Sequence, residues 1–386
     1  MREVGTRSRF ITFFAGLDYL QFGVMLLLLG IGLTFIYSTG EQVDTESSRA
    51  FFGKQLHWIG LGIFLYFLMA AIDYRALPVR FAAFGGYGIT IIALILVLFL
   101  GRTISGATRW LDIGGFRLQP SEPAKLAIIC VLANIFSDPR FGKSPLKIAV
   151  LTAMTVGVPF ALIAIEPDLG SALILLPVTG AMLFCFGIKW RYILTILLVV
   201  CCCIAVVLAD CFVWEKPLLL RSYQIDRIKI FMNPGMDKQG RGLNAYQAMN
   251  SVGSGGLSGK GIGKGTQNEL GFLPQTVSNN DFIFSVLAEE TGFTGSLFLL
   301  ALYMTLLYTI LRTAFLTGGY GRFLATGIGT MFFCHIFINI GMNIGVAPIT
   351  GLPLPLLSYG GSFTLTGMGT LGMLQSIYRS RDELIS

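Results

Sequence analysis

Few side chains in this sequence of 386 residues can exchange protons, and the most informative of them are carboxylates. The chain has only two histidines, far apart, and its seven cysteines form no C-x-x-C pair, so a His/Cys metal site is not expected. Asp281 stands in S-N-N-D-F-I-F-S-V-L-A-E-E, at the start of a long apolar run. At that boundary a carboxylate suits a general base, and it suits equally well a cap for the helix that follows.

A second group of ionisable residues lies at the starts of two other apolar runs. Glu122 and Lys125 are three residues apart, which places them on one face of a helix. Such a pair either pins the helix as a salt bridge or borders a polar cavity and orients a substrate. Asp168 occupies the tight turn E-P-D-L-G, where it can cap the next helix or face the same cavity as a second carboxylate.

Two glycine-punctuated segments carry cations. Arg109 and Trp110 adjoin each other in G-A-T-R-W-L, which predicts anion binding and stacking, or else an aromatic-belt residue with a snorkelling neighbour. The segment G-S-G-G-L-S-G-K-G-I-G-K-G-T-Q fails the P-loop pattern, because Gly follows both Gly-Lys pairs. Its amides, with Lys260, Lys264 and Gln267, can still bind a substrate pyrophosphate, and a merely flexible loop is the alternative.

The amino-acid composition indicates whether these residues belong to a water-soluble or a membrane protein. Hydrophobic residues make up 54% of the chain and charged residues only 13%, about half the charged fraction of a soluble domain. The net charge of +7 is scattered between apolar runs and forms no basic face, so nucleic acid is not an expected partner. We therefore predict an all-α, polytopic integral membrane protein.

Apolar runs of about 20 residues predict the membrane spans. The candidates are 17–38, 56–73, 80–100, 122–137, 147–166, 168–188, 192–213, 282–311, 323–345 and 363–378. About ten spans in one membrane domain, residues 1–386, put both termini on the same side.

The distribution of basic residues predicts which side that is. With the N-terminus inside, inner segments hold 14 of the 28 Lys and Arg residues, short outer segments hold six, and the long loop 214–281 holds the remaining eight. Long loops are largely exempt from the positive-inside rule, so both termini are predicted to be cytoplasmic. The outer segments are then 101–121, the large extracytoplasmic loop 214–281, and the Pro/Gly-rich 346–362, and together they carry most of the residues discussed above.

Several motifs resemble those of one known family, the SEDS proteins (shape, elongation, division and sporulation). The motifs are G-A-T-R-W-L…Q-P-S-E-P-A-K, E-P-D-L-G-S-A, Y-Q-I-D-R-I, the glycine-rich segment above, D-F-I-F-S-V-L-A-E-E-T-G, and P-I-T-G-L-P-L-P-L-L-S-Y-G-G-S. They occur in the family's order from the first span to the C-terminus, and the last is specific to the family. The compact termini make the chain more similar to the RodA-like, elongation branch than to the division branch.

The resemblance implies a ten-span fold and a peptidoglycan glycosyltransferase that polymerises lipid II at the outer leaflet of the bacterial inner membrane. It places the family's essential aspartate at Asp281, its loop tryptophan at Trp110, and its Glu/Lys pair at Glu122 and Lys125. It also implies a growing glycan strand as substrate, a class B penicillin-binding protein (a transpeptidase) and other elongation-complex proteins as partners, and no organic cofactor. Three departures from the pattern are Y-Q-A-M-N-S-V around Gln247, His335 where Gln is usual, and Thr291-Gly292 after the paired glutamates.

The chemistry of such a transfer sets what the residues must do. An acceptor hydroxyl attacks an anomeric carbon whose leaving group is a polyprenyl pyrophosphate, so a carboxylate must take the hydroxyl proton, and Asp281 is predicted to do so. Arg109, Lys125, Lys260 and Lys264 are candidates to stabilise the leaving group, with Mg²⁺ or Mn²⁺ conceivable through Asp281. The alternatives are a flippase for the same lipid, which needs polar residues along a path across the membrane, and a non-catalytic scaffold.

Overall fold

The structure is a computed structural model that describes residues 13–41, 45–104, 107–141, 144–189, 241–266 and 275–381, with short pieces between 191 and 232. The described part is mostly helical. Its helices are α2 (Tyr19–Glu41), α3 (Thr45–Ala71), α4 (Leu77–Leu100), α5 (Ser121–Ser137), α6 (Pro145–Ile165), α7 (Leu169–Phe186), α10 (Arg241–Ser254), α12 (Gln275–Ser278), α13 (Ile283–Leu316), α14 (Gly319–Asn343) and α15 (Gly361–Arg379), with the 3-10 turn η1 (Pro139–Phe141).

Seven of the described helices are long and apolar enough to cross a membrane: α2, α3, α4, α6, α7, α13 and α14. The shorter α5 and the more polar α15 coincide with the predicted spans 122–137 and 363–378. The one remaining candidate, 192–213, lies almost wholly outside the described residues. The prediction of a polytopic, helical membrane protein is confirmed, while the full count of ten spans stays a prediction.

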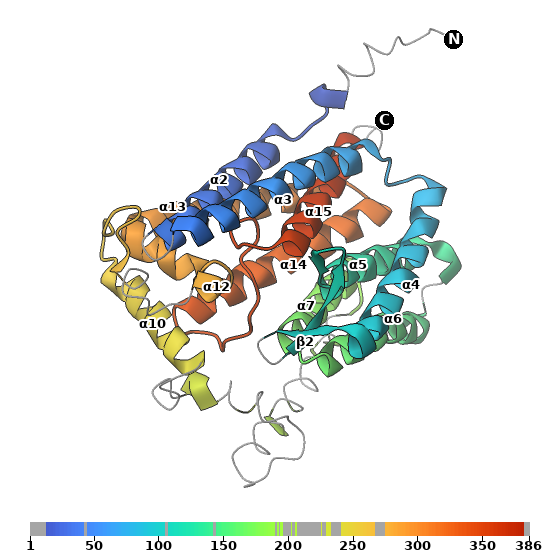
Figure 1. Cartoon of the computed structure of the whole chain (residues 1–386). Helices are drawn as coiled ribbons and strands as arrows, with labels where there is room; N and C mark the ends of the chain where they lie inside the picture. Colours follow the sequence, from blue (N-terminus) through green and yellow to red (C-terminus); the bar gives the residue numbers. More distant parts are fainter. Residues whose placement is uncertain are drawn as a thin grey trace.

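Helix α14 occupies a central place, because it packs against α13, α7 and α5 and also touches α10. Helices α3 and α15 form another extensive contact, and α2 lies against both α3 and α13. Figure 1 shows these helices running side by side, with the start of α2 and the end of α15 at the same end of the molecule. A residue on α14 can therefore contact several other spans at once.

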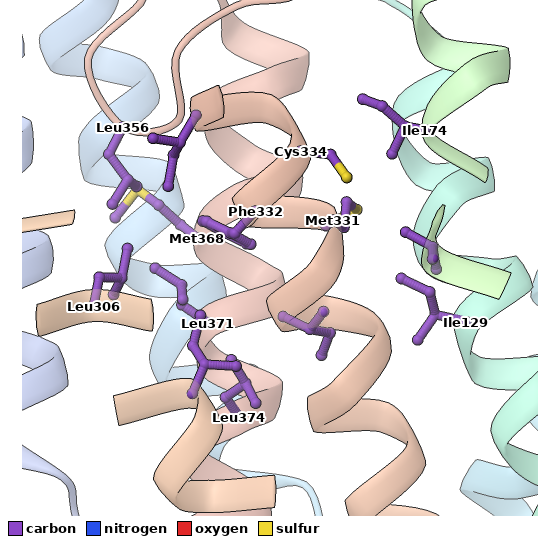
Figure 2. Close-up of a cluster of buried hydrophobic side chains, with 14 of the residues drawn as sticks. Ile129, Ile174, Leu306, Met331, Phe332, Cys334, Leu356, Met368, Leu371 and Leu374 are labelled. Carbon is purple, nitrogen blue, oxygen red and sulfur yellow. The ribbon is translucent and has the colours of Figure 1, made fainter. Parts of the chain in front are cut away.

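Apolar side chains fill the space on either side of α14 (Figure 2). Met331 and Cys334 of α14 face Ile129 of α5 and Ile174 of α7, whereas Phe332 faces the side of α15 that carries Met368, Leu371 and Leu374. All of these side chains are buried. Because lipid is as apolar as this core, close packing rather than the hydrophobic effect must hold the spans together.

A polar cluster joins the first and last spans at the end where the termini lie. The Arg312 guanidinium donates to the Asp18 carboxylate at 2.7 Å, and the Asp18 amide donates to the Gln375 side chain at 2.8 Å. Arg312 also lies over the Tyr378 ring. Buried charges need such partners, so this cluster fixes α2, α13 and α15 relative to one another.

The segment predicted as the loop 101–121 forms a small antiparallel sheet, in the order β1 (Arg102–Ile104), β2 (Ala107–Ile113) and β3 (Phe116–Leu118). Gly114 and Gly115, both with positive φ, make the two-residue turn between β2 and β3, as hairpins of this length require. The sheet follows α4 directly and lies away from the start of α2 (Figure 1). Pairing satisfies the backbone of this segment and gives its side chains defined directions.

Helix α13 is interrupted at Gly292, whose φ is 69°. A Cβ atom at Gly292 would lie 2.3 Å from the Gly259 amide nitrogen, and one at Gly259 would lie 2.2 Å from the Glu290 carbonyl oxygen. Only glycine at both positions allows this close approach. Gly292, part of the Thr291-Gly292 departure noted in the sequence, therefore allows the glycine-rich segment to pack against α13.

Candidate functional site

Asp281 lies in the turn between α12 and α13 and is half-buried. It is not the N-cap of α13: that position is Phe282, which makes no capping hydrogen bond through its side chain. The Ser285 amide of the first turn instead donates to the Asn343 side-chain oxygen at 3.2 Å. The N-cap position thus belongs to Phe282, and α14 supplies an acceptor to the first turn of α13, while the choice between a cap and a base for Asp281 stays a prediction.

The turn that carries Asp281 is held by three consecutive backbone carbonyls. The Asn279 carbonyl accepts from the Tyr359 amide at 2.9 Å, and the Asn280 carbonyl accepts from the Ser358 hydroxyl at 2.6 Å. The Asp281 carbonyl accepts from the side-chain amides of two asparagines on α14. Since these donors belong to two different segments, α14 and the connection before α15, the backbone at Asp281 is anchored from two sides.

Gly351 lies beside the Asp281 carboxylate, in the Pro/Gly-rich connection before α15. A Cβ atom at Gly351 would lie 3.5 Å from Oδ2 of Asp281, so the glycine leaves room next to the carboxylate. Its φ of 74° is in the left-handed region that favours glycine. The connection 346–362 thus meets the turn at Asp281, as their predicted placement on one side of the membrane requires.

Glu122 and Lys125 form the predicted pair, with Nζ 2.9 Å from Oε1 and both side chains almost fully buried. The ammonium also lies 2.8 Å from Nε2 of His335 on α14. An ammonium group has only donors, so Nε2 must accept, and the ring proton resides on Nδ1, which faces the Pro353 carbonyl at 3.3 Å. The neutral histidine therefore connects α5, α14 and the connection before α15.

A small cavity of about 20 Å³ adjoins this group. Glu122 and His335 contribute to its wall, and the remaining wall is mainly apolar, from Met331, Phe332, Pro355, Leu356, Phe363, Thr366 and Gly367. A cavity of this size has room for about one water molecule. The pair thus forms the salt bridge that one interpretation predicted, and Glu122 borders a small, mainly apolar cavity; a role in orienting a substrate stays a prediction.

Asp168 is the N-cap of α7, where its carboxylate accepts from the Ser171 amide. The same buried carboxylate lies 3.4 Å from Nη1 of Arg109. It also accepts from the side-chain amide of Gln119 at 3.1 Å and from the Ser121 hydroxyl at 3.4 Å. Strand β2 directs Arg109 to this cluster, where the guanidinium also donates to the Pro167 carbonyl. Asp168 thus caps α7, as one interpretation predicted, and also joins a polar cluster, while its facing a cavity as a second carboxylate stays a prediction. The neighbouring Trp110 is half-buried on β2.

Glu166 was not selected from the sequence, although it stands two residues before Asp168 in the same turn. Its side chain is buried, and within the described structure Oε1 has no hydrogen-bond partner. Burial, and secondarily the Asp168 carboxylate, raise the pKa of Glu166 to about 8, against a smaller lowering by Arg109. The signal that could have found it is a second acid in a turn too tight to expose both.

The glycine-rich segment lies against the deeper part of α13. The Lys260 ammonium is 2.6 Å from the Glu289 carboxylate, and the Gly263 amide donates to the Glu290 carboxylate at 3.0 Å. The Lys260 amide also donates to the Glu289 carbonyl. These contacts show the loop supporting the paired glutamates, and Lys260 is already paired.

The structure says less about the other two predicted residues of that segment, Lys264 and Gln267. Lys264 is exposed, and Gln267 lies outside the described residues. Glu289 follows Asp281 by eight residues, or about 12 Å along a helix, so Lys260 does not share the immediate surroundings of Asp281. A role for these three residues in substrate binding stays a prediction.

A protein-built metal site is not present among the described residues, since no group of three or more His, Cys, Asp or Glu side chains is placed to hold an ion. The carbonyl of Asp281 is already saturated by asparagine donors. The Asp281 carboxylate would have to hold Mg²⁺ or Mn²⁺ together with substrate phosphates and water, so a metal there stays a prediction, and we derive no step through it.

The fold and site together define a polytopic membrane protein in which buried polar contacts link α5 to α7, α5 to α14, and α14 to the turn at Asp281. Comparison with known proteins gives the family. The model described as "Cell cycle protein" (FTSW_RODA_SPOVE) matches residues 18–383, so the chain belongs to the FtsW/RodA/SpoVE family. The resemblance to the SEDS proteins is confirmed.

Individual relatives are similar over nearly the whole chain. "Peptidoglycan glycosyltransferase MrdB" of Escherichia coli (strain K12) is 36% identical, covering 95% of each chain. "Peptidoglycan glycosyltransferase RodA" of Treponema pallidum is 32% identical, covering 93% of this chain and 97% of the relative. A chain from a solved peptidoglycan synthase complex that coordinates polymerization and crosslinking superposes with a TM-score of 0.77 at 28% identity, covering 95% of this chain and 98% of that chain.

Proposed function

We propose that Asp281 is the general base with which this chain polymerises lipid II into glycan strands. The chain is a peptidoglycan glycosyltransferase by family: the family model spans almost all of it, and the relatives described above carry that activity in their names. The observation that carries the role of Asp281 is its turn, which is anchored through three consecutive carbonyls, with Gly351 leaving room beside the carboxylate.

The proposed reaction is a single displacement. The hydroxyl oxygen of the acceptor sugar forms a bond to the anomeric carbon of the donor, and the Asp281 carboxylate takes the hydroxyl proton. The bond from that carbon to the polyprenyl pyrophosphate breaks, and the pyrophosphate leaves with the bonding electrons. One base and direct attack imply inversion, from an α-linked donor to a β-linked glycan.

Among the candidate cations, Arg109 is best suited to the leaving group. Lys125 is almost fully buried between Glu122 and His335, and Lys260 is paired with Glu289. The Arg109 guanidinium is held by Asp168, yet its Nε has no hydrogen-bond partner within the described structure. An unused guanidinium donor in a preorganised cluster suits a developing phosphate charge.

The family and the complex just described also support a setting for this reaction. We place the chain in the bacterial inner membrane, with both termini cytoplasmic and Asp281 near the outer leaflet. Its expected partners are a class B penicillin-binding protein, which would cross-link the strands, and other proteins of the elongation complex. Dependence on Mg²⁺ or Mn²⁺ stays a prediction, and chelation with EDTA during turnover tests it.

The decisive experiment compares Asp281→Asn and Asp281→Ala in purified protein supplied with lipid II. Both should lower the rate of polymerisation by a factor of about 10² to 10⁴, because neither side chain can accept the proton. Both proteins should fold with near-normal thermal stability, because neither substitution removes the backbone carbonyls that hold the turn, and Asn343 supplies an acceptor to the first turn of α13. A folded Asp281→Asn protein with near-normal glycan output would move the search to Asp168 and Glu122. If the chain is a non-catalytic scaffold, both substitutions at Asp281 should be tolerated. If it is a flippase, the purified protein should move lipid II across vesicles without forming glycan.

A further inference from the structure

One face of α14 carries a stripe of buried polar residues. His335, Asn339 and Asn343 follow one another at intervals of four residues, so they lie one above the other along the helix. Their exposed fractions are 2%, 0% and 0%. Polar side chains at membrane depth persist only where their hydrogen bonds are satisfied, and each of these three has hydrogen-bond partners.

Asn339 and Asn343 use their amide hydrogens on backbone carbonyls. Nδ2 of Asn339 donates to the Asp281 carbonyl at 3.0 Å and to the Leu352 carbonyl at 2.8 Å. Nδ2 of Asn343 donates to the same Asp281 carbonyl at 3.1 Å and to the Asn339 carbonyl at 2.8 Å. Two asparagines thus occupy both lone pairs of one carbonyl oxygen, that of Asp281.

The same asparagines also hold the two segments next to Asp281, the first turn of α13 and the segment at Leu352. Through the Ser285 amide, Asn343 holds the first turn of α13, which begins two residues after the aspartate. Through the Leu352 carbonyl, Asn339 holds the residue that follows Gly351, beside which the carboxylate lies. The backbone of a residue with a short side chain, such as aspartate, fixes the position of its Cβ atom and limits its rotamers, so these bonds restrict where the carboxylate can point.

We propose that Asn339 and Asn343 are positioning residues that hold the Asp281 turn against the Leu352 segment in the geometry needed for proton transfer. The proposal rests on the base role of Asp281 and goes beyond it, because it assigns to α14 the task of aiming that base. Misplacement of a catalytic group by about 1 Å can cost about 10²-fold in rate. Substrate affinity depends on other groups, so the loss should fall on kcat.

Asn339→Leu and Asn343→Leu test this proposal, since leucine is similar in size and lacks the amide donors. Each should lower kcat for glycan synthesis by a factor of about 10 to 10², with KM for lipid II changed by less than about threefold. The matched control is Asn134→Leu on α5, another buried asparagine, which binds Arg80 and not the Asp281 turn. Its kcat, per folded molecule, should stay within about twofold of the parent.

A second measurement does not depend on turnover. In an Asp281→Cys protein, the rate at which a maleimide labels the thiol reports the position of that side chain. Adding Asn339→Leu or Asn343→Leu should change this rate at least about threefold, whereas adding Asn134→Leu should not. The readout remains valid even if Asp281 is not the base.

The two measurements separate the two proposals. Changed labelling with normal kcat would support the positioning role and overturn the base role of Asp281. Unchanged labelling would overturn the positioning role, whatever happens to kcat. Loss of kcat together with changed labelling, for the α14 variants and not for the control, is the expected result.

Discussion

The Lys125 ammonium donates to Nε2 of His335 across 2.8 Å, although the two residues are 210 positions apart in the chain. This hydrogen bond joins the charged pair on α5 to the polar stripe on α14, one turn from the asparagines that hold Asp281. The residue at 335 departs from the glutamine expected for the family, and its geometry explains the exchange. A glutamine offers the same two functions, an oxygen that accepts and an NH₂ that donates.

His335→Gln should therefore keep activity within about threefold of the parent, because Lys125 and the Pro353 carbonyl both retain a partner. His335→Leu should lower activity and stability together, since it leaves a buried ammonium without one of its acceptors. Polymerisation of lipid II and thermal unfolding of the purified protein measure the two effects. Equal losses in the two variants would show that the imidazole does something that a side-chain amide cannot.

The pair Glu122 and Lys125 should behave as a unit. Removing one partner leaves the other charge buried and unpaired, so Glu122→Gln and Lys125→Met should each destabilise the protein by about 3–5 kcal/mol. The double variant should lose less than the sum. Thermal or denaturant unfolding of the four proteins measures the coupling free energy, and strict additivity would show that the pair does not interact.

The Arg109–Asp168 contact predicts a difference between two conservative changes. Arg109→Lys keeps the charge but loses the planar fork that reaches Asp168 and Pro167 together, so kcat/KM should fall by a factor of about 10 or more. Arg102→Lys on β1 is a matched control, because Arg102 is exposed and its partner is Asp112 of the sheet. Steady-state kinetics with lipid II compare the two variants, and equal activities would remove Arg109 from the substrate site.

Glu166 predicts a pH dependence of stability. Its pKa in the folded protein is about 8, above the ordinary value of 4.5, so the folded state retains a proton that the unfolded state releases. This contribution to stability is fully present below pH 4.5 and is lost as the pH rises toward 8. Glu166→Gln resembles the protonated form at every pH, so it removes the pH dependence.

Melting temperatures of the parent and of Glu166→Gln, measured from pH 5 to pH 9, test this dependence. The difference in Tm should move in favour of the glutamine variant as the pH rises, and level off above about pH 8. A constant difference across the range would mean that Glu166 is already ionised in the folded protein.

The helices themselves could be predicted because they depend on local properties. A run of about 20 apolar residues predicts a span whatever its neighbours are, and nine of the ten candidate runs coincide with described helices, while 192–213 lies almost wholly outside them. The Glu122–Lys125 pair could equally be predicted from the sequence, because a spacing of three residues puts two side chains on one face of any helix. Asp281 was singled out by its position at the start of an apolar run and by the motif around it.

Contacts between spans were decided only by tertiary structure. Spacing cannot show that Asn343 supplies an acceptor to the first turn of α13, that His335 meets Lys125, or that Glu166 is buried beside Asp168. Each depends on which helix faces lie together, and lipid, being as apolar as the core, leaves that choice to close packing and interhelical hydrogen bonds. The sequence by itself thus determined the spans and most of the chemically important residues, and the packing of α14 against its neighbours decided how those residues are held.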